Sequence, residues 1–363
     1  MRKKILSILL IISITIIVAI VVINLNNAKK NNGDEGENRV NIVASFYPTY
    51  ILTLNIADGI PGINISNLTD YSSGCLHDYQ ITTDDMKTLS KADILVINGG
   101  GMENFIEDAI NSYPDLIIVD ASHGIEFIKD ENHSHNHGHS HNEDAEEDHE
   151  AHSGENQEKH SDENHKHNEA NQEDYIYKNS HIWLNPLLYI RQIENVRDSL
   201  IEFIEKMGIY NDDELNDIIA TMKNNASTYI DKVIRLDEEL TSLMESNIDK
   251  LYGEEKEEVV IFHDAFLYLA ERMGLEVAYT VEMDTDTYLS AGEIAEIIDI
   301  IDEHDIKYLL TELQYSDSIA KRIEEETGAR VYIIDSAVTG DGTKDSYLTS
   351  MYHNIDVLKD ALQ

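Results

Sequence analysis

Residues 211–250 read NDDELNDIIATMKNNASTYIDKVIRLDEELTSLMESNIDK and contain neither glycine nor proline. Apolar side chains recur along this segment at spacings of three and four, from Leu215 to Leu243. That period predicts one continuous amphipathic helix of about 40 residues, which would extend about 60 Å. Such a helix is longer than one small lobe requires, so we expect a stiff strut along two lobes. The same spacing also suits a coiled-coil dimer, which stays open as an alternative.

The segments on both sides of this helix alternate short apolar runs with helix-like stretches. Before it, strands are expected over 41–46, 63–68, 94–98 and 116–119, and helices over 50–57, 82–90 and 102–112. After it, strands are expected over 259–262, 277–281, 308–310 and 331–334, and helices over 266–273, 291–304, 317–327 and 345–362. The alternation predicts an α/β protein of two similar lobes, each a mostly parallel sheet wrapped by helices, joined by the long rigid helix.

A histidine-rich tract interrupts the first lobe. Residues 133–167 hold ten of the sixteen histidines and no apolar side chain larger than alanine. Because this composition cannot build a core, residues 130–174 are expected to form a disordered loop. Imidazole favours zinc, copper and nickel over calcium or magnesium, so the tract is expected to gather zinc or a similar cation loosely.

The first 24 residues predict an export segment. Arg2, Lys3 and Lys4 precede an apolar stretch at 5–23, which is close to the roughly 20 residues that span a bilayer. The stretch exceeds the apolar region of a usual signal peptide, so an uncleaved membrane anchor is expected, with a cleaved secretory signal as the alternative. Residues 25–39 would then form a polar tether. The remaining chain is expected at the cell surface, or periplasmic or secreted after cleavage.

The net charge and the cysteine content exclude several binding partners and modes of stabilisation. The formal net charge of −43 at pH 7 argues against nucleic acid and anionic lipid. The single cysteine, Cys75, excludes an intramolecular disulfide framework, so the exported part must be stable through its own core. Because Cys75 also lies far from the N-terminal segment, a lipoprotein is not expected.

Four residues outside the tract are candidate ligands for one metal ion. His77 lies in GCLHDYQ after the second expected strand, His181 in SHIWLNP, and His263 in IFHDAF where a strand stops and Asp264 can cap a helix. Asp335 closes the last expected strand in VYIIDSA. Each alone is more often a cap or a hydrogen-bonded loop residue. Together, three neutral imidazoles and one carboxylate match the four-coordinate preference of zinc, and one cleft between two lobes could collect them.

Neighbouring residues are expected to support these ligands. A ligating imidazole usually donates its second N–H to a carboxylate or a carbonyl. The candidates by position are Asp78, Asp264 and Glu312. Glu312 could instead touch the metal. Cys75 could do so if its loop folded back, but burial as a small apolar side chain is the expected role. Trp183 and Tyr79 are expected to line the cleft.

As a set, GCLHDYQITTDD, SHIWLNP, IFHDAF and VYIIDSA resemble motifs of the zinc-binding solute-binding proteins of bacterial ABC importers, in the cluster that also serves manganese and iron. The resemblance covers roughly residues 41–363 and includes the histidine-rich insertion. It implies two lobes joined by a long helix, with the metal between them. The implied ligands are His77, His181, His263 and Asp335. Manganese-selective relatives typically carry a carboxylate where His263 stands, so this histidine favours zinc.

The chain departs from the family pattern at three places. Family members often carry aspartate where Asn185 stands, and a proline-serine-aspartate run where Thr83, Asp84 and Asp85 stand. Their lipid-bearing cysteine is absent here, which moves the expected anchoring to the N-terminal segment. The expected division is an anchor or signal at 1–24, a tether at 25–39, an N-terminal metal-binding lobe at 40–210, a linking helix at 211–250 and a C-terminal metal-binding lobe at 251–363.

The resulting hypothesis is an extracytoplasmic, high-affinity zinc receptor that delivers its ion to an ABC permease without bond chemistry. Because a ligating imidazole must be neutral, capture should weaken as pH falls below about 6.5. Three alternatives stay open: a manganese or iron receptor of the same family, a surface zinc buffer or adhesin, and an extracellular zinc hydrolase. Against the hydrolase, the chain shows no HExxH pattern and no evident nucleophile arrangement.

Overall fold

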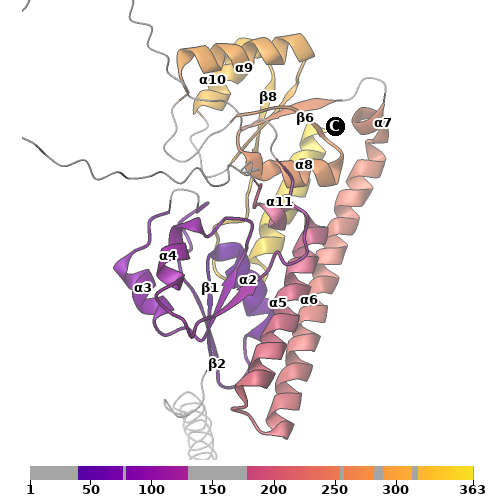
Figure 1. Ribbon diagram of the computed structural model, residues 1–363. Helices are drawn as coiled ribbons and strands as arrows, with labels where there is room; N and C mark the ends of the chain where they lie inside the picture. The colour runs from indigo at the N-terminus through magenta and orange to yellow at the C-terminus, as the bar shows by residue number, and fades with distance from the viewer. Residues whose placement is uncertain are drawn as a thin grey trace, which may run out of the picture.

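The computed structural model describes residues 40–76, 79–129, 178–253, 257–281, 289–312 and 318–362 (Figure 1). The expected anchor and tether at 1–39, the histidine-rich tract and His77 lie outside the described residues. Two sheets form two lobes, and a pair of long helices runs beside them (Figure 1). Within the described ranges, no helix has the length and apolar character needed to cross a bilayer.

The N-terminal lobe is built on a parallel sheet in the order β2-β1-β3-β4. Its strands are β1 (Val40–Ala44), β2 (Ile63–Asn67), β3 (Ile94–Ile97) and β4 (Ile117–Asp120), and its connecting helices are α2 (Tyr47–Ala57), α3 (Thr83–Leu89) and α4 (Glu107–Ile110). The helix expected over 102–112 is shorter than predicted. Three glycines at 99–101 adopt positive φ angles, and a 3₁₀ turn, Asn104–Ile106, follows before α4 begins.

The C-terminal lobe repeats this plan in a parallel sheet of order β6-β5-β7-β8. Its strands are β5 (Glu258–Ile261), β6 (Glu276–Thr280), β7 (Tyr308–Glu312) and β8 (Arg330–Ile334), and its helices are α8 (Leu267–Met273), α9 (Ala291–His304), α10 (Ser318–Thr327) and α11 (Ser346–Ala361). In each sheet the second strand in sequence lies at the edge, beside the first. The predicted fold class of two similar α/β lobes is confirmed.

The linking helix is shorter than the sequence predicts. α6 spans Asp212–Ser246, 35 residues. The helix ends at Asn247, and the short helix α7 (Ile248–Tyr252) follows. The Asn247 side chain donates to the Leu243 carbonyl at 3.0 Å and its backbone N–H donates to the Met244 carbonyl at 3.1 Å. An asparagine that satisfies terminal carbonyls in this way ends a helix without glycine or proline.

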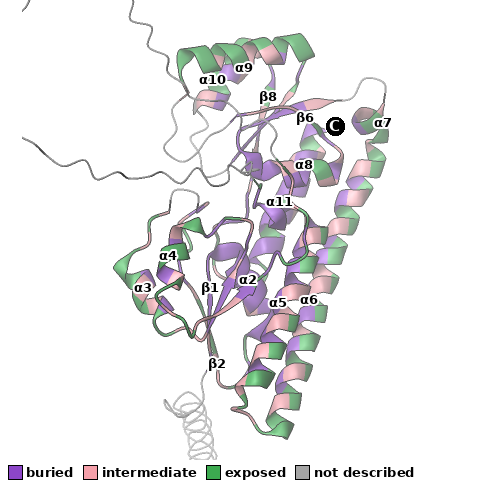
Figure 2. Ribbon diagram, viewed as in Figure 1, coloured by how far each residue is buried: buried purple, intermediate pink, exposed green. Residues whose placement is uncertain are grey.

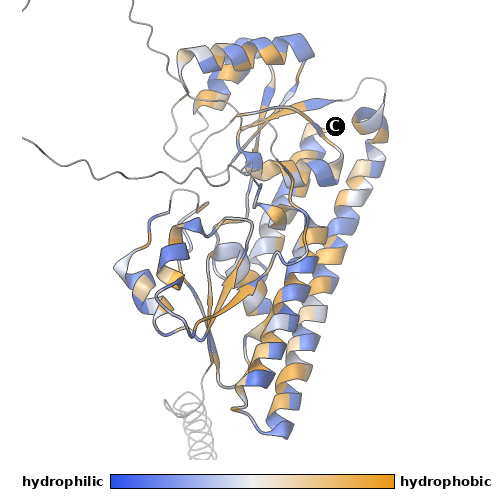
Figure 3. Ribbon diagram, viewed as in Figure 1, coloured by the Kyte–Doolittle hydropathy of each residue, from blue (hydrophilic) through white to orange (hydrophobic). Residues whose placement is uncertain are grey.

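The apolar stripe of α6 packs inside the chain itself. Met222, Val233 and Leu240 on this stripe are fully buried. They face α2, α11 and a long helix before α6, α5 (Pro186–Met207). Figure 2 shows buried positions alternating with exposed ones along α6, and Figure 3 shows the matching alternation of hydrophobic and hydrophilic residues. Because the stripe is already covered, a coiled-coil dimer through this face finds no apolar surface to bury.

A buried junction of aromatic side chains holds the two lobes together. The Trp183 indole N–H donates to the Ser336 carbonyl at 2.8 Å, and the Tyr347 hydroxyl donates to the Trp183 carbonyl at 2.9 Å. The Tyr47 and Ser346 hydroxyls lie 2.7 Å apart. These bonds join η2 (Ile182–Leu184) and α2 to segments that follow β8. The lobes are therefore tied at several points besides α6.

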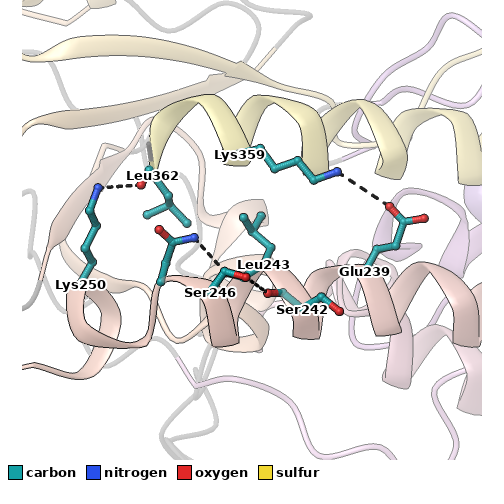
Figure 4. A pocket seen from close by; sticks show the side chains of 8 residues that line it. Glu239, Ser242, Leu243, Ser246, Lys250, Lys359 and Leu362 are labelled. Atoms are coloured by element: carbon teal, nitrogen blue, oxygen red, sulfur yellow. Dashed lines mark hydrogen bonds and ion pairs between the residues drawn. The ribbon is translucent and has the colours of Figure 1, made fainter.

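The end of α11 lies against the end of α6. Lys250 Nζ donates to the Leu362 carbonyl at 2.6 Å, and Lys359 Nζ lies 3.9 Å from a carboxylate oxygen of Glu239 (Figure 4). A pocket of about 570 Å³ lies between the two ends. Its lining residues are Glu239, Ser242, Leu243, Ser246, Asn247, Lys250, Lys359 and Leu362. None of them is a candidate metal ligand, so the pocket is a feature of helix packing.

Candidate metal centre

His181 is positioned by the turn that enters α5. Asn185 caps this helix by accepting the Leu187 backbone N–H at 3.1 Å, and Pro186 occupies its first turn as predicted. Asparagine and aspartate cap helices equally well, so the departure at Asn185 preserves the local structure. The η2 turn between His181 and Asn185 buries the His181 side chain completely.

The hydrogen bonds of His181 orient its ring. Its Nδ1 lies 2.9 Å from Asn179 Oδ1, and the Asn179 amide N–H₂ donates to the Asp264 carbonyl at 2.7 Å. Because the amide nitrogen is engaged there, Asn179 presents its oxygen to His181, and Nδ1 must carry the proton. The lone pair of His181 is therefore on Nε2, which is the arrangement of a metal-ligating histidine.

His263 comes from the other lobe, directly after β5. Its Nδ1 lies 2.8 Å from Glu312 Oε2, at the end of the adjacent strand β7. The second Glu312 oxygen accepts the Ser336 hydroxyl. This carboxylate therefore orients the His263 ring through Nδ1, the role expected of Glu312 from its position.

Asp264 lies beside both rings, one position after the N-cap residue His263. Its Oδ1 is 3.3 Å from His263 Nε2 and 3.7 Å from His181 Nδ1. The expectation that Asp264 caps a helix is wrong in position, because the N-cap residues here are His263 and Phe266 and Asp264 is the first residue of the 3₁₀ turn Asp264–Phe266. The carboxylate instead places negative charge against the two imidazoles, which favours a cation between them.

The two histidines meet with Cys75 at the boundary between the lobes. The ring centroids of His181 and His263 lie 4.9 Å apart, and Cys75 Sγ lies 3.0 Å from His181 Nε2. One ligand atom from each of these three residues lies within 4.8 Å of the other two. In tetrahedral zinc sites, neighbouring N and S ligands stand about 3.4–3.6 Å apart. Shifts of about an ångström would therefore arrange the three donors around one ion.

The remaining predicted ligands differ in placement. Asp335 follows β8 and is half-buried; its carboxylate accepts the Ala337 N–H at 2.7 Å, and its own N–H donates to Asn354 Oδ1 at 2.8 Å. It is not a member of the three-residue group. His77 lies outside the described residues, two positions after Cys75. Both remain predictions as ligands.

Two residues of the site differ from what the sequence suggested. Cys75 was expected to be a small buried apolar side chain, but it is only partly buried and its sulfur contacts His181. Its spacing of two from His77 was the available signal. Asn179 was not predicted, because a polar residue two positions before a histidine is ordinary in loops.

A buried carboxylate supports the loop that carries His181. Glu103 accepts the Asn98 backbone N–H at 2.7 Å and the Gly99 N–H at 3.1 Å. The Asn98 side chain in turn donates to the Ser180 carbonyl at 2.8 Å. Burial raises the pKa of Glu103 to about 7, although the bonds it accepts from Ser45 and the two backbone groups oppose this shift.

This carboxylate is expected to make stability depend on pH. Because the folded chain holds the Glu103 proton more tightly than the unfolded chain, the stabilisation is complete below pH 4.5 and lost as pH rises to about 7. The loss is expected to be about 3 kcal/mol, measured by urea denaturation across this range. Glu103→Gln should flatten the dependence, whereas exposed Glu107→Gln should not. Equal slopes in wild type and Glu103→Gln would contradict the assignment.

A family model described as the periplasmic component A of zinc-uptake complexes, ZnuA, matches residues 42–361. The chain belongs to this family. The zinc-binding protein AdcA of Streptococcus pyogenes serotype M3 is 28% identical over 333 residues, which cover 89% of this chain and 56% of AdcA. The chain thus spans little more than half of that relative. The high-affinity zinc uptake system protein ZnuA of Bacillus subtilis is 25% identical over 349 residues, covering 93% of this chain and 92% of the relative.

Solved structures of solute-binding proteins share the fold. The structure of FpvC from Pseudomonas aeruginosa in complex with Mn²⁺ superposes with a TM-score of 0.66 at 19% identity, covering 90% of this chain and 98% of FpvC. A crystal structure of ZnuA superposes with a TM-score of 0.63, also at 19% identity, covering 90% of this chain and 100% of that one. The family resemblance read from the motifs is confirmed, and so is the two-lobe architecture.

Proposed function

We propose that this protein is an extracytoplasmic zinc receptor that captures one ion between its lobes and delivers it to an ABC permease. The observation that carries this proposal is the meeting of His181 and His263. One histidine comes from each lobe, and a polar partner on each Nδ1 orients the ring as in a metal-ligating histidine. Membership in a zinc-uptake family supports the same conclusion.

The proposed ligands are His77, His181, His263 and Asp335. The register of the C-terminal sheet supports Asp335, because Glu312 pairs with Ile334 and Asp335 is the next residue. Asp335 thus belongs to the same sheet edge as the partner of His263. His77 is supported by the sequence, because it is the second residue after Cys75, whose sulfur contacts His181.

The donor types favour zinc over manganese. Imidazole suits zinc, whereas carboxylate and water suit manganese. The fold alone does not choose, because FpvC of the same fold was solved with Ni²⁺ as well as with Mn²⁺. The choice therefore rests on His263 and on the names of the relatives, which describe zinc binding and zinc uptake. The same names support binding without bond chemistry.

The histidine-rich tract is attached beside this site. The described residues on its two sides, Lys129 and Lys178, form an antiparallel bridge. Asn179, which orients His181, follows Lys178 directly. Zinc gathered by the tract would therefore be released close to the ligands. We propose that the tract raises the local zinc concentration and that the permease receives the ion from the site between the lobes.

Zinc titration calorimetry tests this function on the piece 34–363, with and without residues 132–167. One tight zinc equivalent is expected to survive removal of the tract, because its proposed ligands lie outside it. Weak, multiple binding that disappears with the tract would instead favour a surface zinc buffer.

Manganese in the same titration should bind more weakly than zinc, and tighter manganese binding would favour the manganese receptor. Zinc uptake by cells lacking the gene should fall, which tests delivery.

A further inference from the structure

Cys75 lies among the donors of the proposed zinc site, close enough to bind the metal itself. It is the only cysteine of the chain. Its sulfur lies 3.0 Å from His181 Nε2, the atom that would bind the ion. The same sulfur belongs to the group of three ligand atoms that includes His263. A thiol in this position is either displaced by the metal or bound to it.

The loop around Cys75 bears on whether the metal displaces the thiol or binds it. Gly74, immediately before it, has a φ of 72°, a left-handed conformation that turns the chain. Leu76, immediately after it, is 1% exposed and belongs to the hydrophobic core. Because both flanking residues restrain the backbone, the Cys75 Cβ stays near His181, and the sulfur can leave its present place only by rotation about χ1.

The hydrogen bond between Cys75 and His181 has a defined direction. Since His181 Nδ1 donates its proton to Asn179, Nε2 is an acceptor, and the Cys75 S–H is the donor. A metal ion that takes the Nε2 lone pair removes the acceptor of this proton. The thiol then lies within reach of a dication, where thiolates form readily.

We propose that Cys75 is a direct ligand of the metal and that its thiolate sets the selectivity of the site. On binding, the thiol loses its proton to solvent and forms a metal–sulfur bond. Thiolate is a soft donor that suits zinc and disfavours manganese, so the site discriminates through sulfur as well as through imidazole. This inference rests on the proposed zinc-receptor function and places Cys75 in its ligand set, where at most three of the four ligands proposed above complete a tetrahedral site with the sulfur.

Cobalt spectroscopy tests the inference on the full-length protein, because Co²⁺ replaces zinc and reports thiolate ligation by a charge-transfer band in the near ultraviolet. The histidine-rich tract carries no cysteine, so only Cys75 can produce this band. We expect the band in the wild type and its loss in Cys75→Ser and Cys75→Ala. Zinc affinity should fall about 100-fold in both variants. This loss equals the upper end of the 10- to 100-fold range seen when a group that only supports a ligand is removed. Ser73→Ala in the same loop should change neither quantity.

The possible outcomes distinguish a failure of this inference from a failure of the proposed zinc-receptor function. A wild type that binds one zinc ion tightly but shows no sulfur band, and a Cys75→Ser variant of equal affinity, would overturn the inference and leave the receptor intact. A wild type without any tight zinc site would overturn both. Circular dichroism of each variant distinguishes a lost ligand from a lost fold. As a further arm, Cys75→Asp should lower the ratio of zinc to manganese affinity at least about tenfold, because oxygen replaces sulfur.

Discussion

Replacing His263 by alanine is expected to lower zinc affinity by more than about 100-fold, because it removes a ligand, and even groups that only orient ligands are worth 10- to 100-fold. The variant also leaves Glu312, 1% exposed, without the imidazole it contacts at 2.8 Å. Calorimetric titration of the piece 34–363 without residues 132–167 measures the effect free of binding by the tract.

A matched control for this variant lies on the surface of the same lobe. His304 also contacts a carboxylate through Nδ1, Glu258 at 2.8 Å, but this pair is exposed. His304→Ala should therefore leave the tight zinc site unchanged. Wild-type zinc affinity in His263→Ala would show that the ion does not bind between the lobes, and the receptor proposal would then lose its central observation.

Trp183→Ala is expected to destabilise the protein by about 3–5 kcal/mol, the usual cost of removing a large aromatic side chain from a core. Trp183 is fully buried and its ring packs edge-on against Phe46 at 5.2 Å between centroids. The change also leaves the Ser336 carbonyl without its indole donor. Guanidinium denaturation measures the free energy of unfolding.

Two comparison variants divide this effect into its parts. Trp183→Phe keeps most of the volume and removes the N–H, so it should cost about 1–3 kcal/mol, the penalty for one unsatisfied buried group. Leu187→Ala, at a position 51% exposed in the next helix, should change stability by less than about 0.5 kcal/mol. A Trp183→Ala variant as stable as Leu187→Ala would mean that the junction between the lobes does not depend on this side chain.

Several elements were predictable because their causes are local. All eight described strands fall within two residues of the expected runs, since the central strands are near-continuous apolar stretches and the edge strand β2 alternates apolar with polar residues. Pro186 marked the start of α5 for the same kind of reason. The end of α6 was predicted wrongly, because Asn247 ends the helix through its own side chain and the neighbouring carbonyls.

The sequence by itself determined the two α/β lobes and the long helix between them, and it singled out His181 and His263 as candidate ligands, because periodicity and strand ends are properties of short segments. Only the tertiary structure decided that Asn179 and Glu312 orient those histidines and that Cys75 lies against His181. Glu312 and Cys75 reach these histidines from distant segments that folding brings together, and Asn179, two positions from His181, is held by its bond to the distant Asp264 carbonyl. Hydrogen bonds depend on distance and direction in space, and neither is encoded in the spacing of residues along the chain.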